Sequence, residues 1–422
     1  MKPTSARRVG AATLAAALTF SSLALAGPAA AALPGTWWTS YYDLADAGKV
    51  STGRGVTVAV VDTGVQANLP DLAGRVLPGK SFVVGGTATT DIADPGAPYY
   101  GHGTAMAGFI AATGRGTGYR GVAPGATILP VGIANASAQL SSEATSQGIR
   151  YAVDKGAKVI NVSSGEVRSC PPEMQQAVDY AARKDVIVVA AVGNTVGQTI
   201  GAPANCIGVI GIGVLADSST FSAWSGQSSG PDVDFIAPGQ NLSTLLLNRS
   251  YSKPDGTGSS ESAAIASGAF ALLRAKFPKD SARQIVTRAM YSLQNKAGKQ
   301  NFGKRINDQI GYGALQPQFA LTVSPPANAA NPIYDQLDKH LAATAAGTGS
   351  AAPSSAASSP APQAANDDGG GIPAGLIVAI VVLAVAVVVV IAVVVARSRR
   401  RPAAPGYGPP PGHGPPGGYG RG

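Results

Sequence analysis

The chain has few charged side chains for its length. Charged residues make up 13% of its 422 positions, whereas glycine and proline number 54 and 31. This composition is typical of a fold rich in small residues with low-complexity stretches, and untypical of a charged cytosolic enzyme. The net charge of +9 does not indicate nucleic-acid binding, because much of the excess lies at the two ends beside apolar runs, where basic residues set membrane topology.

Histidine and cysteine are also scarce. The three histidines are His102, His340 and His413, and the last two fall in segments with the composition of a linker and a tail. A folded domain that uses histidine as a general base therefore has only His102. The two cysteines, Cys170 and Cys206, would tend to pair in an exported protein and stay reduced in a cytosolic one. No run of carboxylates marks a calcium site, and we expect neither a metal nor a cofactor.

Residues 1–32 have the pattern of a secretory signal peptide. A basic start is followed by the apolar, Ala/Leu-rich segment Ala11–Ala26, and Ala-x-Ala patterns end near Ala26 or Ala32. The alternative is an N-terminal membrane anchor. The apolar run is short for spanning a bilayer and is followed by Gly-Pro-Ala-Ala, so cleavage is favoured.

The C-terminal part of the chain contains a long apolar run. Residues 375–396 carry no charge and are long enough to cross about 30 Å of hydrocarbon, which predicts a membrane-spanning helix. Arginines at the start of the tail, residues 397–422, place the C-terminus in the cytoplasm and the central block outside. Residues 325–374 are rich in Ala, Ser, Pro and Gly and predict a disordered linker, within which a helix around Ile333–Leu341 is only weakly signalled.

The central block, residues 33–324, alternates strand and helix patterns. Apolar, β-branched runs suited to buried strands occur at Val56–Val61, Lys158–Ser163, Val186–Val192 and Val209–Leu215. Helical periodicity occurs between some of them, at Ser142–Val153 and Glu173–Arg183. The alternation predicts an α/β fold in which helices cover both faces of a mostly parallel sheet. Such sheets have their ligand sites at the carboxyl ends of the strands.

Three short segments of this block carry side chains suited to catalysis. An apolar strand ends in Asp62, and His102 lies between two glycines at the start of an Ala-rich helix. The Gly/Ser stretch 256–262 enters a small-residue helix, where a serine gains from unpaired N–H groups and the helix dipole. Taken singly, Asp62 has an Asx turn as its alternative and His102 a helix cap, and the serine is better explained as an ordinary N-cap. Their order, Asp then His then Ser, is that of the subtilisin triad.

The same segments resemble the signatures of the subtilase family. Val-Asp-Thr-Gly at 61–64, Gly-His-Gly-Thr at 101–104 and Gly-Val-Ala-Pro at 121–124 match that family's patterns, and the resemblance covers about residues 45 to 321. It implies a subtilisin-like three-layer fold. It also implies a serine endopeptidase that cleaves protein substrates through an acyl-enzyme, with Asp62 and His102 in the triad.

Two further segments acquire roles from this resemblance. The Val-Gly-Asn sequence ending at Asn194 resembles the segment whose Asn side chain donates to the oxyanion. The segment Ser163, Ser164 and Gly165 resembles the strand that pairs with the substrate backbone and forms one wall of the S1 pocket.

The serine region departs from the family pattern. The usual Gly-Thr-Ser is broken because Gly258 stands where the serine should be, and in that register the chain is a pseudoenzyme. The family's glycine eight residues after the nucleophile matches Gly268 instead. This register places the nucleophile at Ser260, which we favour over Ser259, Ser262 or no nucleophile. Glu261 then takes the usual Met position, where a carboxylate is expected to lower turnover or shape substrate preference.

The order of the segments resembles one branch of the family, the mycosins of actinobacterial type VII secretion systems. These proteases combine a signal peptide, a protease domain, a linker, one membrane helix and a basic tail. Only about 30 residues separate the predicted cleavage site from Asp62, too few for an ordinary pro-domain. The Ser-Cys-Pro context at Cys170 is also mycosin-like, and the resemblance implies a Cys170–Cys206 disulfide, with two free thiols as the alternative.

The resemblance implies a protein substrate, the plasma membrane and a type VII secretion complex as partners. Mycosins also stabilise that complex, so the altered serine region leaves a second hypothesis: a mainly structural component with weak or absent protease activity. A cell-surface peptidase unrelated to type VII secretion ranks lower. A lipase-like hydrolase also ranks lower, because the chain lacks its Gly-x-Ser-x-Gly elbow here.

Overall fold

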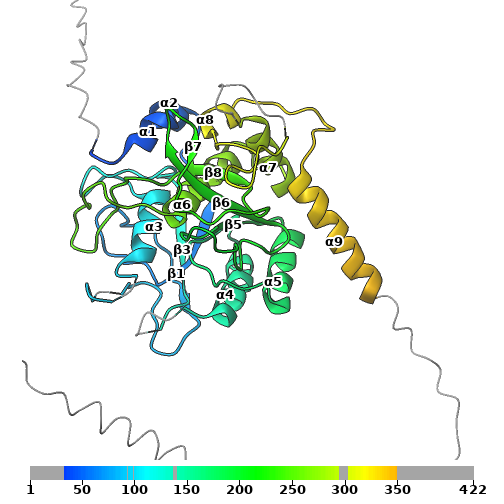
Figure 1. Ribbon diagram of the computed structural model, residues 1–422. Helices are drawn as coiled ribbons and strands as arrows, with labels where there is room; N and C mark the ends of the chain where they lie inside the picture. Colours follow the sequence, from blue (N-terminus) through cyan, green and yellow to red (C-terminus); the bar gives the residue numbers. More distant parts are fainter. Residues whose placement is uncertain (1–32, 93, 98, 136–139, 294–302, 349–422) are drawn as a thin grey trace, which may run out of the picture. The chain divides into compact units, whose positions relative to one another are not determined.

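The computed structural model describes residues 33–348 apart from residues 93, 98, 136–139 and 294–302 (Figure 1). The predicted signal peptide, the predicted membrane helix at 375–396 and the tail lie outside the described residues. Among the residues that are described, no helix is both long and apolar enough to cross a membrane.

An eight-stranded sheet forms the centre of the described region. Its order is β2-β3-β1-β4-β5-β6-β7, and β8 also pairs with β6. All pairings are parallel except that of β6 with β7. The four predicted strands are confirmed as β1, β4, β5 and β6. The strands are β1 (Thr57–Asp62), β2 (Lys80–Ser81), β3 (Thr127–Gly132), β4 (Val159–Val162), β5 (Ile187–Ala191), β6 (Val209–Asp217), β7 (Ser222–Ala223) and β8 (Phe235–Pro238).

The helices begin where the sequence supplies caps. The Ser141 side chain accepts from the Ala144 N–H at the start of α4, and Ser281 and Gln284 form a capping box at α7. Both helices predicted from periodicity, α4 and α5, are confirmed. Within the described residues the helices are α1 (Trp37–Tyr41), α2 (Leu44–Val50), α3 (His102–Ala111), α4 (Ser142–Asp154), α5 (Pro172–Arg183), α6 (Ser259–Lys276), α7 (Ala282–Tyr291), α8 (Pro317–Ala320) and α9 (Pro332–Thr348).

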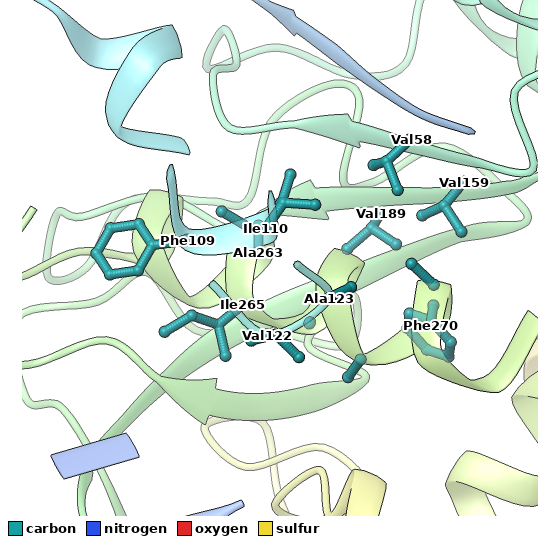
Figure 2. Close-up of a cluster of buried hydrophobic side chains, with 14 of the residues drawn as sticks. Val58, Phe109, Ile110, Val122, Ala123, Val159, Val189, Ala263, Ile265 and Phe270 are labelled. Carbon is teal, nitrogen blue, oxygen red and sulfur yellow. The ribbon is translucent and has the colours of Figure 1, made fainter. Parts of the chain in front are cut away.

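The two faces of the sheet have separate apolar cores. Because side chains alternate along a strand, Val58 and Val60 of β1 face one core, and Ala59 and Val61 face the other. Helices α3 and α6 cover the first face, whereas α4 and α5 cover the second. In the first core (Figure 2), valines from three neighbouring strands meet α3, α6 and the loop after α3: Val58, Val159, Val189, Phe109, Ile110, Val122, Ala123, Ala263, Ile265 and Phe270. The predicted α/β fold with a mostly parallel, doubly covered sheet is confirmed.

The carboxyl ends of β1, β4 and β5 lie side by side, because these strands are parallel neighbours. β1 ends at Asp62, β4 leads into Ser163, and β5 leads towards Asn194. Helix α6 packs against β4 and β5 from one face, and its first residues meet the segment after β4. The topology therefore brings four distant parts of the chain to one edge of the sheet.

The prediction of a disordered linker from residue 325 is wrong over α9. This helix presents Ile333, Tyr334 and Leu337 on one face, and all three are buried against the core, with exposed fractions of 6%, 6% and 2%. The folded unit therefore extends past residue 324. Composition misled the prediction because the long Ala/Ser/Pro-rich stretch outweighs one short apolar stripe at helical spacing.

Polar contacts add to the docking of α9. Arg283 of α7 donates to Asp335 at 2.7 Å and to Asp338 at 2.8 Å. The His340 ring, read from sequence as a linker residue, lies 3.1 Å from both carboxylate oxygens of Asp179 on α5. These pairs join α9 to two other helices of the fold.

Truncating the buried α9 leucine is expected to destabilise the protein. Leu337→Ala removes a fully packed side chain, which lies close enough to Gly208 to meet any Cβ added there. We expect a loss of about 3 kcal/mol in the free energy of unfolding, measured by denaturant titration of the full-length protein. Lys339→Ala, on the exposed face of the same helix, is the matched control and should change it by less than about 0.5 kcal/mol. Equal effects of the two changes would mean that α9 is not part of the core.

Candidate active site

Asp62 and His102 form a hydrogen-bonded pair at the end of β1. Nδ1 of His102 lies 2.8 Å from Oδ1 of Asp62, whose side chain is 1% exposed. The same oxygen accepts the Thr63 backbone N–H at 2.8 Å. A buried carboxylate that accepts from Nδ1 fixes the imidazole tautomer and leaves Nε2 as the free base.

The two glycines around the histidine make this approach possible. Gly101 has φ +61°, a left-handed conformation that turns the chain into α3. A Cβ at residue 103 would collide with the carbonyl oxygen of Gly64, so the start of α3 lies directly against the turn after β1. The Gly-His-Gly pattern therefore reflects the close approach of the backbone at the start of α3 to the backbone of the turn after β1.

Negative neighbours raise the pKa of the His102 imidazole. Burial lowers this pKa, but the Asp62 carboxylate opposes it through its charge and its hydrogen bond. Glu261 and Asp91 add smaller contributions of the same sign. The net result is a pKa raised from 6.5 to about 9.

The three serines at the start of α6 have different surroundings. Ser259 is buried: its hydroxyl accepts the Gly193 N–H at 3.0 Å and donates to Oδ1 of Asn194 at 3.0 Å. Ser262 is fully buried and donates to the Ala237 carbonyl. Ser260 alone of the three is partly exposed. Its hydroxyl donates to the carbonyl of Ser163 at 2.8 Å, and the Ser163 hydroxyl donates back to the Ser260 carbonyl at 2.9 Å.

Asn194 is held by the residue before Ser260. Oδ1 of Asn194 accepts both the Ser259 N–H, at 2.8 Å, and the Ser259 hydroxyl. These two bonds identify Oδ1 as the acceptor side of the amide and leave the Nδ2 donor for the cleft. The predicted oxyanion segment and the predicted nucleophile segment are therefore hydrogen-bonded to each other.

A cavity of about 260 Å³ lies between the segments after β4 and β5. Ser163, Ser164 and Gly165 line one side, as the sequence predicts for a substrate-binding segment, and Asn194 and Ser260 also line it. Most of the lining is small or polar, and Glu166 is its one carboxylate within the described residues.

Glu261 lies on the other side of Ser260, outside the lining of this cavity. Its carboxylate is close to the glycines that precede Ser260, since a Cβ at Gly258 would lie 2.9 Å from Oε2 and one at Gly256 would lie 3.4 Å from Oε1. Burial raises the pKa of Glu261, and the nearby charge of His102 opposes the rise. The effect of this carboxylate on turnover or preference stays a prediction.

The structure joins Cys170 and Cys206 in a disulfide, with Cα atoms 5.1 Å apart, as the family resemblance implied. The bridge links the segment before α5 to the one before β6. Concerning cofactors, the described residues include no group of three or more His, Cys, Asp or Glu side chains placed to hold a metal ion.

Sequence reasoning missed two residues beside His102. Tyr99 lines the cavity, and its ring packs edge-on against the imidazole with centroids 5.6 Å apart. Asp91 is a buried carboxylate that accepts from Thr63 and Thr104 on either side of the Asp–His pair. Both lie in the irregular segment before α3, where no periodicity or family motif marks them.

An Asp–His pair and a helix-start serine at the carboxyl edge of a parallel sheet are the arrangement expected of a serine hydrolase. Comparison with known proteins agrees. Residues 53–313 match the sequence model of the Subtilase family. The chain is 34% identical to subtilisin DY of Bacillus licheniformis over 258 residues, covering 60% of this chain and 89% of that one. It is 38% identical to thermitase of Thermoactinomyces vulgaris over 212 residues, covering 49% and 71%.

Among solved structures, similar ones include the MycP3 protease from the type VII (ESX-3) secretion system. The TM-score is 0.56 with 28% identity, covering 70% of this chain and 90% of that one. MycP1 from Mycobacterium smegmatis gives a TM-score of 0.58 with 26% identity, covering 70% and 87%. The chain belongs to the subtilase family of serine proteases, and its structural neighbours include mycosin proteases.

Proposed function

We propose that this chain is a serine endopeptidase in which Ser260 is the nucleophile and His102 is its general base. Asp62 orients the imidazole and stabilises the imidazolium. The observation that carries the proposal is the buried Asp62–His102 hydrogen bond at the same sheet edge as the start of α6, where Ser260 alone of the three serines is partly exposed. Asn194 and the Ser260 N–H supply the oxyanion hole.

The reaction follows from these roles. The Ser260 hydroxyl turns from the Ser163 carbonyl towards Nε2 of His102 and attacks the scissile carbonyl carbon as its proton passes to the imidazole. Nδ2 of Asn194 donates to the developing oxyanion. The imidazolium then protonates the leaving amine, and a water molecule, activated by the same His102, releases the acyl group from Ser260.

The substrate is a peptide in extended conformation. The segment Ser163–Gly165 follows an interior strand of the sheet and offers backbone groups for β-augmentation, with side-chain preference set by the adjoining cavity. A modest, mostly uncharged cavity favours a small or medium uncharged side chain on the acyl side of the scissile bond.

Active-site labelling tests the enzymatic proposal. The full-length protein in detergent is treated with a fluorophosphonate probe, and the modified residue is mapped by mass spectrometry. Covalent labelling of the peptide that contains Ser260 is expected, since such probes need an activated serine. A folded protein that takes up no label, or that is labelled elsewhere, would refute the assignment.

The raised pKa of His102 predicts activity that increases into the alkaline range. The free enzyme needs a neutral imidazole, so kcat/KM should rise with pH through a midpoint near 9, well above 6.5. Glu261→Gln removes one of the charges that raise this pKa and should move the midpoint to lower pH. Peptide hydrolysis measured from pH 5 to 11 checks both, and a midpoint at or below 6.5 in the unaltered protein contradicts the expectation.

We further propose that the protease domain is extracytoplasmic and anchored by residues 375–396, with the C-terminus in the cytoplasm. The apolar run and the arginines after it support this orientation. Carbonate extraction should leave the full-length protein in membranes and release a variant that ends at residue 372. Protease added to intact spheroplasts should digest the catalytic domain but spare a tag at the C-terminus; the reverse pattern would overturn the orientation.

The similarity to MycP3 and MycP1 supports a place in a type VII secretion system. A mainly structural role there is the second candidate, and the non-standard Gly-Ser-Ser-Glu sequence at 258–261 favours it. Complementation of a deletion strain separates the two. Secretion restored by Ser260→Ala as well as by the unaltered chain would favour the structural role, whereas restoration only by the unaltered chain would favour proteolysis.

A further inference from the structure

A second buried carboxylate lies behind the Asp–His pair. Asp91 is 8% exposed and accepts four hydrogen bonds. Oδ1 accepts from the Thr63 hydroxyl at 2.6 Å and the Ile92 N–H at 2.7 Å. Oδ2 accepts from the N–H and the hydroxyl of Thr104, at 2.7 and 2.6 Å. All four hydrogen-bond partners are donors, which favours the ionised carboxylate, although burial and the charge of Asp62 raise the pKa of Asp91.

The Thr63 hydroxyl has one hydrogen and two acceptors within reach. Its oxygen accepts the Gly103 N–H at 2.9 Å, so its own hydrogen must point elsewhere. Oδ1 of Asp91 is 2.6 Å away, whereas Oδ1 of Asp62 is 3.2 Å away. The shorter contact takes the hydrogen, and Asp91 therefore draws it away from the oxygen that His102 uses.

We propose that Asp91 is a positioning residue of the catalytic pair, which holds the Thr63 hydroxyl hydrogen off Asp62 and so keeps Oδ1 of Asp62 a strong acceptor for His102. The inference rests on the proposed protease function. Through Thr104, in the first turn of α3, the same carboxylate also fixes the helix that carries His102. One group thus sets both the place and the basicity of the imidazole.

Loss of the Asp91 carboxylate should shift the pH dependence of activity in one direction, to lower pH. In Asp91→Asn the side-chain amide can replace only part of the acceptor set, and the Thr63 hydroxyl turns to Asp62. A carboxylate with one more donor holds an imidazolium less strongly, and a nearby negative charge is also lost. The other charged or ring neighbours of His102 (Asp62, Glu261 and Tyr99) are unchanged. The acidic limb of the pH profile of kcat/KM should therefore move to lower pH, by about one unit.

A second variant separates the effect of the Thr63 hydroxyl from the effect of the Asp91 charge. Thr63→Val has no hydroxyl hydrogen to redirect, so adding Asp91→Asn to it should shift the limb by less than half of the shift seen in the unaltered background. Equal shifts in the two backgrounds would show that only charge is involved and would overturn the role of Thr63. No shift in either, with kcat alone reduced, would mean that Asp91 is merely structural.

A readout without substrate keeps this test apart from the protease proposal. The Nδ1 proton between His102 and Asp62 gives a low-field NMR signal in the resting full-length protein, and its titration should move to lower pH in Asp91→Asn. Asp71→Asn is the control, because Asp71 is also buried and accepts backbone N–H groups of Gly116 and Thr117 away from the site. It should leave the signal unmoved. If the fluorophosphonate fails to label but the NMR titration shifts, the protease proposal fails and this inference stands.

Discussion

Replacing Ser260 with alanine is expected to lower kcat for peptide hydrolysis by about a million-fold, the scale of loss when a subtilisin loses its nucleophile. The change deletes the attacking oxygen and one hydrogen bond, to the Ser163 carbonyl. The fold should survive, because Ser260 is only partly buried and the Ser163 hydroxyl still finds the carbonyl of residue 260. Progress curves with a fluorogenic peptide, beside thermal unfolding of the same samples, measure both.

Ser259→Ala is the matched control for this result. The Ser259 hydroxyl is hydrogen-bonded to Gly193 and Asn194. Its loss should make the position of the Asn194 amide less fixed and slow the reaction without abolishing it. The two variants therefore test the register of the nucleophile. An inactive Ser259→Ala beside an active Ser260→Ala would show that the register is wrong by one residue.

Removing the Asn194 amide should lower kcat by about 100- to 1,000-fold and change KM by only a few-fold. In the proposed mechanism the Nδ2 donor stabilises charge that develops only in the transition state, so the ground-state complex loses little. Asn194→Ala also removes the acceptor that holds Ser259. Asn194→Asp keeps an oxygen facing Ser259 but has no donor, and it adds a negative charge beside the oxyanion. Steady-state kinetics of both variants are the measurement.

A loss in Asn194→Asp at least as large as that in Asn194→Ala is expected if the donor matters. Should Asn194→Asp retain nearly full kcat, the contribution of Asn194 would instead be to support Ser259, and the oxyanion hole would have to be sought among backbone N–H groups. The fluorophosphonate reaction rate gives an independent check, because its transition state also needs the oxyanion donors.

Much of the site could be predicted because its residues follow local signals. Asp62 is the last residue of a buried apolar strand, and His102 is the first residue of a helix, so parallel topology alone brings both to one edge. Asn194 follows β5, a strand that its run of apolar residues marks clearly. For Ser260, spacing to Gly268 decides the register, and the burial of Ser259 and Ser262 agrees with it.

The residues that could not be predicted depend on tertiary contacts. Asp91 lies in an irregular segment, and only the folded chain brings it between Thr63 and Thr104. Helix α9 was only weakly signalled for a different reason: its buried face has three apolar side chains in a stretch whose overall composition is that of a linker. The chain has two cysteines and therefore one possible intrachain pairing, so the resemblance was needed only to favour a disulfide over two free thiols.

The bonds of Ser259 also have a dynamic consequence. They connect the start of α6 to the segment after β5 at three points: the Gly193 N–H, and two donors to Asn194 Oδ1. In the proposed mechanism, displacement of the helix start should carry the Asn194 amide, the oxyanion donor, with it. In that mechanism the attacking oxygen of Ser260 and the amide donor of Asn194 would then move as one unit, although both residues line the cavity.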